Sequence, residues 1–301
     1  MSKRALLNLT LLCVVIALAL VVFYKPGKDK PANTKLTDFE NSDIQLIQLD
    51  RTGNPTIKFK RVDKTWHMTE PYTLKANSIT VEALLDLLAY NHHGQYDMAE
   101  LDPKTYGLDL PRASITFNEK YKFDFGTTET LNKYRYIRYN NKLNLTDDYY
   151  YHRILGAATS FLDHALLPEN SQIENLIIPG LKLTQQDGTW QANPSPSKFS
   201  NDRANELAEN WQHAHGNEIT QYDPAKEKAS AKVIIQLKGN DAAITYDILT
   251  IDNEFYLGRA DLKIKYKLAK EKRRDLLQLP AALNTSDIVT PEAESPKATS
   301  K

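Results

Sequence analysis

Two histidine pairs are the first candidates for chemistry. His213 and His215 are separated by one residue, and His92 and His93 occupy a comparable place earlier in the chain. Imidazole is a common zinc ligand, but a zinc site needs three or four convergent ligands. The sequence has no HExxH pattern and only one cysteine. We therefore expect the histidines to be polar residues at helix ends, where they suit the helix dipole. His213 and His215 remain weak metal candidates, and we predict neither a metal nor a cofactor.

A second candidate is the stretch from Ser195 to Lys198, which matches the SxxK pattern of penicillin-recognising enzymes. In those enzymes the serine begins a buried helix and the lysine follows one turn later. Here Pro194 and Pro196 flank the serine, and no SDN or KTG partner occurs. Gly-rich phosphate loops and the GxSxG elbow are absent too. We find no catalytic pattern and expect a protein that is not an enzyme. A hydrolase stays open as the second alternative, because paired carboxylates meet only in the fold.

Tyrosines interleaved with arginines form the third candidate, a possible binding surface made of Tyr134, Arg135, Tyr136, Arg138 and Tyr139. If exposed, these side chains suit a glycan, a small ligand or a protein interface. The pattern also suits single-stranded nucleic acid. The simpler interpretation is structural, because tyrosine favours half-buried strand faces.

The composition limits the function classes. The chain has 301 residues, with 38 Lys and Arg against 38 Asp and Glu, so its formal net charge is zero. This balance argues against a nucleic-acid partner, which would favour a basic chain. A single cysteine excludes a disulfide framework within the chain. The length is sufficient for about two domains.

The amino-terminal region predicts a membrane anchor. Residues 5–24 form a nearly unbroken apolar run without a charged residue, and a helix of this length crosses a bilayer core of about 30 Å. Basic residues flank the run on both sides. We expect residues 1–4 in the cytoplasm, a tether over residues 25–40, and a single pass through the inner (cytoplasmic) membrane. The body then lies on the periplasmic, extracytoplasmic side.

The amino-terminal region allows three other interpretations. A signal peptide could be cleaved after the small residues at 17–19, but the apolar run continues to Tyr24. Lipidation of Cys13 would need a small residue before it, and Leu12 stands there. The opposite orientation would put the body in the cytoplasm. We favour the uncleaved anchor.

The body reads as a tandem repeat. Each half has a hairpin whose second strand carries a tryptophan, Trp66 or Trp190, then an amphipathic helix, three strand-like runs and a closing helix. This order predicts an α+β fold with two repeats of roughly β-β-α-β-β-β-α and mainly antiparallel sheets. The expected limits are 41–168 and 169–280 for the repeats, 152–167 and 266–279 for the closing helices, and 281–301 for a disordered tail.

The amphipathic helices have apolar residues at i, i+3, i+4 and i+7. These residues are Val81, Leu84, Leu85 and Leu88 in the first half, and Ala204, Leu207, Ala208 and Trp211 in the second. We expect Ser78 and Ser200 to be the N-caps. Gly94 and Gly216 are expected to end the helices.

Short matching stretches link the chain to a family. They are Lys64-Thr65-Trp66, Glu70-Pro71, the leucine-rich residues 84–88, and Tyr106-Gly107-Leu108-Asp109-Leu110-Pro111. With the apolar amino end, this pattern resembles the family known as domain of unknown function 4340, most clearly over residues 40–165. The resemblance implies a membrane-anchored bacterial envelope protein, and some relatives look like auxiliary parts of ABC-type export systems. It supplies no catalytic residues.

These observations together predict a non-enzymatic accessory or interaction protein of an envelope assembly. The expected partner is an envelope protein, with subunits of an ABC-type transporter as one class. The first alternative is a module that binds a glycan or small ligand through the tyrosine-rich strands.

Overall fold

The computed structural model describes residues 11–19, 35–149 and 151–281. Its body is a mixture of helices and two antiparallel sheets, so the expected α+β class is confirmed. The described residues divide into two compact units, one ending at Gly156 and the other beginning at Ala157. This division falls earlier in the chain than the expected limit between residues 168 and 169.

The first unit is built on a nine-stranded antiparallel sheet with the order β4-β3-β2-β1-β6-β7-β8-β9-β5. Its strands are β1 (Leu46–Arg51), β2 (Asn54–Val62), β3 (Thr65–Glu70), β4 (Leu74–Lys75), β5 (Gly94–Asp97), β6 (Ala113–Phe117), β7 (Tyr121–Thr128), β8 (Arg135–Tyr139) and β9 (Lys142–Thr146). Its helices are η1 (Asn41–Asp43), α2 (Ser78–Leu85), η2 (Asp86–Ala89), η3 (Met98–Glu100), η4 (Pro103–Tyr106) and α3 (Tyr151–Ile154).

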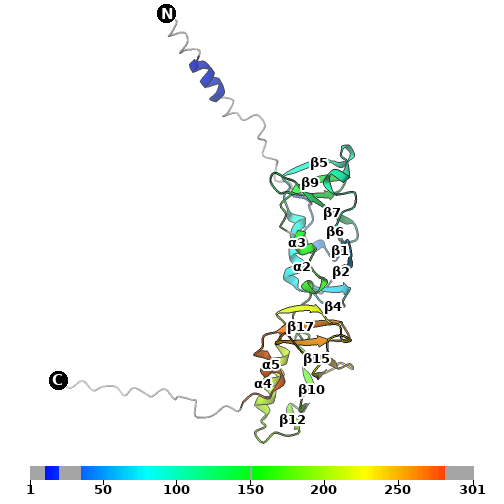
Figure 1. Cartoon of the computed structure of the whole chain (residues 1–301), viewed down its shortest axis with the longest axis vertical. Coiled ribbons are helices and arrows are strands. Elements are labelled where there is room, and N and C mark those ends of the chain that lie inside the picture. Colours follow the sequence, from blue (N-terminus) through cyan, green and yellow to red (C-terminus); the bar gives the residue numbers. More distant parts are fainter. Residues whose placement is uncertain (1–10, 20–34, 150, 282–301) are drawn as a thin grey trace, which may run out of the picture. The chain divides into compact units, whose positions relative to one another are not determined.

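One face of this sheet forms the core. Figure 1 shows α2 and α3 on the same side of the sheet. Because strand side chains alternate between faces, every second residue is buried under the helices, including Ile47 and Leu49 of β1 and Phe123 and Phe125 of β7. We call this side the helix face and the opposite side the open face.

The second unit has an eight-stranded antiparallel sheet with the order β12-β11-β10-β14-β15-β16-β17-β13. Its strands are β10 (Ile173–Ile178), β11 (Leu181–Gln186), β12 (Thr189–Asn193), β13 (Glu218–Gln221), β14 (Ala231–Leu237), β15 (Ile244–Ile251), β16 (Glu254–Arg259) and β17 (Ile264–Leu268). Its helices are η5 (Ala158–Phe161), α4 (Asn201–Gln212) and α5 (Lys272–Leu277). Apart from β4, the two sheets have the same order when strands are compared in chain sequence, the arrangement that tandem repeats predict.

Trp211 of α4 is at the centre of the second core. It is fully buried, its ring lies 5.7 Å from that of Tyr246, and its Nε1 donates a hydrogen bond of 2.8 Å to the carbonyl of Leu276. The Tyr246 hydroxyl donates to the carbonyl of Leu166. Leu166 therefore packs in the second unit, whereas the expected limits place it in the first repeat.

The expected element order is incomplete. Before its long helix the first unit has two more strands, β1 and β4, and the second unit has one more, β10. After that helix each unit has two more, β5 and β9 or β13 and β17. The helix expected over 266–279 was wrong at its start, because Ile264, Tyr266 and Leu268 alternate with lysines and are buried in β17. Helix begins there only at Lys272. The helix expected over 152–167 is reduced to the short turns α3 and η5.

The two amphipathic helices are confirmed, since all eight of their expected apolar residues are buried. Ser200 is the N-cap of α4, and its Oγ accepts a hydrogen bond from the backbone N–H of Arg203 at 3.4 Å. Ser78 was the wrong cap, because Asn77 caps α2 and accepts from the N–H of Thr80 at 3.1 Å. Gly94 and Gly216 do not end the helices, which stop at Ala89 and Gln212.

Most of the amino-terminal predictions lie outside the described residues. Of the expected anchor, only residues 11–19 are described, and they are helical. No helix within the described ranges combines the length and apolar character that crossing a membrane requires. The expected cytoplasmic start at 1–4, most of the tether over 25–40 and all but the first residue of the tail over 281–301 are not described.

Candidate functional site: an aromatic surface on the first sheet

The tyrosine–arginine stretch forms β8, which pairs with β7 on one side and β9 on the other. Alternation along the strand puts Arg135, Ile137 and Tyr139 on the helix face, and Tyr136 and Arg138 on the open face. The five predicted binding residues therefore do not form one surface.

Arg135 serves the core of the first unit. It is buried, and its Nε and Nη2 donate to Asp148 Oδ1 and Oδ2 at 2.5 and 2.7 Å. Its Nη1 donates to the carbonyl of Gly126 at 2.5 Å, and its guanidinium lies 3.5 Å from the ring centre of Tyr151. Tyr139 is stacked on Phe123 with ring centres 4.2 Å apart. Both residues are thus engaged by their own chain.

Arg138 compensates a buried carboxylate. Its Nε and Nη2 donate to Asp124 Oδ2 at 3.0 and 2.7 Å, and the Nζ of Lys122 lies 3.1 Å from Oδ1. The Asp124 side chain is only 7% exposed. A buried charge is costly without such partners, so the primary contact of Arg138 is structural.

The second unit has a matching carboxylate. Asp247 is the fourth residue of eight in β15, as Asp124 is in β7, and its side chain is 6% exposed. Opposite it stands Gly258, in the place that Arg138 holds in the first unit. A Cβ on Gly258 would lie 2.7 Å from the ring of Tyr222. The tyrosine fills that space, and its hydroxyl donates to Asp247 Oδ2 at 2.8 Å.

Tyr136 belongs to an aromatic surface on the open face of the first sheet. Its ring meets that of Tyr106 edge-on, with centres 4.9 Å apart, and it packs on a cluster of Met98, Leu108 and Leu143. The ring of Tyr96 lies over Gly94, 3.3 Å from the position of a Cβ there. We call Tyr96, Tyr106 and Tyr136 the aromatic surface.

The sheet register places these rings together. Gly94 pairs with Leu145, and Leu145 pairs with Tyr136, so Tyr96 lies over the row of residues that contains Tyr136. Burial, then Glu129 and the other two tyrosines, raise the pKa of Tyr136. Tyr96 is 55% exposed, which makes it the most accessible ring of the three.

A loop beside the aromatic surface is fixed by stacking. The ring of Tyr134 lies parallel to that of His93, with centres 4.0 Å apart. His93 Nε2 is 3.1 Å from Asp147 Oδ2. In the same loop Leu131 is 84% exposed.

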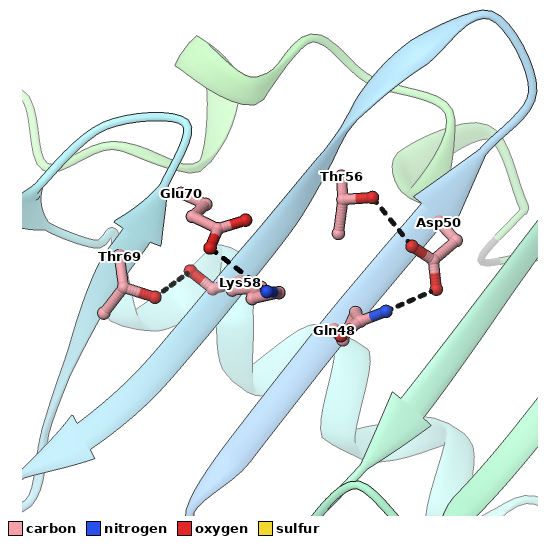
Figure 2. A network of polar contacts seen from close by, with 6 residues as sticks. All are labelled: Gln48, Asp50, Thr56, Lys58, Thr69 and Glu70. Carbon is pink, nitrogen blue, oxygen red and sulfur yellow. Dashed lines mark hydrogen bonds and ion pairs between the residues drawn. The ribbon is translucent and has the colours of Figure 1, made fainter.

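The other end of the open face is polar. Figure 2 shows side chains of β1, β2 and β3 that hold one another. The contacts are Gln48 Nε2 to Asp50 Oδ2 at 2.8 Å, Thr56 Oγ1 to Asp50 Oδ1 at 2.8 Å, Lys58 Nζ to Glu70 Oε1 at 3.1 Å, and Thr69 Oγ1 to the Lys58 carbonyl at 3.3 Å. These groups satisfy each other and leave the rings as the distinctive feature of this face.

Sequence reasoning identified Tyr134 and Tyr136 and missed Tyr96 and Tyr106. The missed tyrosines come from β5 and η4, which lie far from β8 in the sequence. A usable signal was the stretch that begins at Tyr106, because Gly107 has a φ of 67° and turns the chain there.

His213 and His215, the weak metal candidates, do not lie in a group of metal-ligating side chains among the described residues. His215 Nδ1 is 2.8 Å from the carbonyl of His213. Across the described part of the chain, no group of three or more His, Cys, Asp and Glu side chains is placed to hold a metal ion. Ser195 and Lys198 lie between β12 and α4, outside any helix.

Comparison with known proteins gives a family and no further relative. A family model described as a domain of unknown function (DUF4340) matches residues 66–300. The matched region includes all three rings of the aromatic surface and the whole second sheet. No curated protein and no solved structure matches the chain.

Proposed function

This chain belongs to the DUF4340 family, and from that premise we propose that it is a non-enzymatic accessory protein that binds another protein of the cell envelope. Its body is held at the inner membrane by the apolar residues 5–24 and lies on the extracytoplasmic side. Subunits of an ABC-type transporter are the leading class of partner. The nearly unbroken apolar run and the family resemblance support this location and this class.

The aromatic surface carries the proposal. Tyrosine is enriched at protein interfaces because it offers a large apolar ring together with a polar hydroxyl. Tyr96 leaves more than half of its surface exposed, beside two half-buried tyrosines. In contrast, the charged groups Arg135, Arg138 and Asp124 are engaged within the sheet. The accessible part of this region is suited to binding.

Site-directed photo-cross-linking tests the proposal. Benzoylphenylalanine replaces Tyr96 in the full chain in native membranes. The matched control replaces Tyr256, which occupies in β16 the place of Tyr136 in β8 and is covered by the ammonium group of Lys265 at 5.4 Å. We expect one discrete protein adduct from position 96 and none from position 256. Identical adducts from both positions, or none from either, would refute the proposal.

A glycan ligand is the alternative that the same rings favour, because an exposed tyrosine ring can stack on a sugar. A Tyr96→Ala chain that loses retention on purified wall glycan would support this alternative, provided that position 96 gives no protein adduct. Extraction of membranes with alkaline carbonate checks the location, since a protein with a spanning helix stays in the pellet.

A further inference from the structure

In the second unit a lysine ammonium group lies over a tyrosine ring, a contact that the aromatic surface of the first unit lacks. The Nζ of Lys265 lies 5.4 Å from the ring centre of Tyr256 and forms an ion pair with Glu227 Oε2. An ammonium group over a tyrosine face is attracted by the ring electrons. In this unit the chain itself supplies the cation, the ring and the carboxylate.

The first unit has the ring and the carboxylate without that cation. Ile137 pairs with Phe125 and Leu257 with Ile248, so Tyr136 corresponds to Tyr256. Arg138 pairs with Leu143 where Gly258 pairs with Lys265. Leu143 thus stands in the place of the lysine. Glu129 is close enough to Tyr136 to raise the pKa of its hydroxyl.

The segments around the aromatic surface carry more negative than positive charge, although Lys142 of β9 stands opposite Asp97. Residues 94–110 and 127–134 contain two lysines and five carboxylates, namely Asp97, Glu100, Asp102, Asp109 and Glu129. Within the described part of the chain none of the five forms an ion pair. Asp97, Asp102 and Glu129 accept hydrogen bonds from backbone N–H groups, which leaves their charge available.

The chain enters the first unit close to this surface. Lys35 forms a β-bridge with Asn91, and the N–H of Leu36 donates to the carbonyl of Tyr90 at 2.6 Å. The strand β5, which carries Tyr96, begins at Gly94. An extended chain covers at most about 3.6 Å per residue. The stretch between the proposed anchor and Lys35 therefore keeps Lys35, and with it this end of the first unit, within about 40 Å of the bilayer.

We infer that the aromatic surface binds a lysine- or arginine-bearing segment of a membrane protein, close to the bilayer. The partner's cation lies over Tyr96 or Tyr136, as Lys265 lies over Tyr256. The surrounding carboxylates pair with other basic residues of the same partner segment. The same carboxylates repel anionic lipid headgroups, so the occupant is a protein segment. This inference rests on the proposed function and adds the chemistry of the partner.

Binding of defined peptides to the full chain in nonionic detergent tests this inference. The probes are a short fluorescent peptide of lysine, arginine and serine, and its counterpart with glutamate in place of the basic residues. Fluorescence anisotropy gives the Kd at low and at high salt. We expect binding of the basic peptide alone, weakened by salt because the charges are exposed.

Two sets of variants locate the binding. The triple variant Glu100→Gln, Asp109→Asn and Glu129→Gln should raise the Kd about tenfold, from a few-fold for each exposed charge pair. Tyr96→Ala should also raise it several-fold. The matched control removes the same charge from the second unit with Asp187→Asn, Glu218→Gln and Asp241→Asn, all exposed, and should leave the Kd unchanged.

Several outcomes would overturn the inference. They are equal binding of both peptides, an equal loss in the second-unit control, or binding to phosphatidylglycerol vesicles that depends on Tyr96 while the basic peptide stays free. If position 96 gives a protein adduct but the peptides do not bind, this inference fails and the proposed function stands. If neither experiment succeeds, both fail.

Discussion

Two buried aspartates need hydrogen-bond donors, and the two units supply these donors from different residues. Asp124 and Asp247 hold the same position in their sheets, with a lysine near one oxygen of each. The remaining oxygen accepts from the guanidinium of Arg138 in one unit and from the hydroxyl of Tyr222 in the other. The same carboxylate position is therefore satisfied by a guanidinium in one unit and by a tyrosine hydroxyl in the other.

Removing the Tyr222 hydroxyl should destabilise the second unit. Tyr222→Phe keeps the ring against Gly258 but leaves Asp247 Oδ2 without its donor, which costs about 1–3 kcal/mol in the free energy of unfolding. Chemical denaturation followed by circular dichroism measures the loss. Tyr149→Phe, at an exposed ring, is the control and should change nothing. An equal stability of Tyr222→Phe and wild type would show that the hydrogen bond is dispensable.

The same hydroxyl predicts a pH dependence. Burial first, and then the hydrogen bond to Asp247, raise the pKa of Tyr222 above its ordinary value of 10.0. The folded state therefore holds this proton more tightly than the unfolded state. Its contribution to stability is fully present below about pH 10 and is lost as the pH rises further. In Tyr222→Phe that part of the alkaline loss should be absent.

At the scale of elements, long periodic segments were predictable and short strands were not. The helices α2 and α4 follow from the spacing of residues such as Leu84 and Trp211, because one buried stripe determines that spacing. β5 and β13 have four residues each and too little alternation to identify. They are strands because β9 and β17 offer them partners far away in the sequence.

The N-cap of α2 is Asn77 in the structure and Ser78 in the sequence prediction, and mutation can distinguish the two. Asn77→Ala should lower the free energy of unfolding by about 1 kcal/mol, because the amide oxygen satisfies an N–H of the first helical turn. Ser78→Ala should be neutral or slightly stabilising, since Ser78 lies inside the helix and alanine is the better helix former. Denaturant titration of the two variants is the measurement. The reverse order of stabilities would restore Ser78 as the cap.

At the scale of the whole molecule, the position of the boundary has a measurable consequence. Phe161, Leu162, Leu166 and Leu167 are buried, and the N–H of Leu166 donates to the carbonyl of Ala214 at 2.9 Å. A fragment of residues 157–281 keeps these contacts, whereas one that begins at the expected limit, residue 169, loses them. We expect cooperative thermal unfolding of the longer fragment and a markedly lower Tm for the shorter one. Equal Tm values would place the boundary between residues 168 and 169.

The α+β class and the tandem repeat could be predicted from the sequence because they depend on local patterns, such as those around Trp66 and Trp190. The site was only half accessible. Tyr136 was identified from its neighbours in β8, but its companions Tyr96 and Tyr106 join it through pairing and turns between distant segments. Arg135 and Arg138 are held by Asp148 and Asp124, and these contacts cannot be read from the sequence because the acids lie on other segments.

The strand order also governs how the protein is made. β1 is the first strand among the described residues but lies inside its sheet, between β2 and β6. During synthesis the meander of β1, β2 and β3 can form early, while one edge of β1 stays open until residues 113–117 emerge. In the second unit one edge of β10 likewise stays unpaired until β14 has been synthesised. An unpaired edge is a template for wrong pairing, so each half passes through a vulnerable interval in which a chaperone on the newborn chain would raise the yield of folded protein.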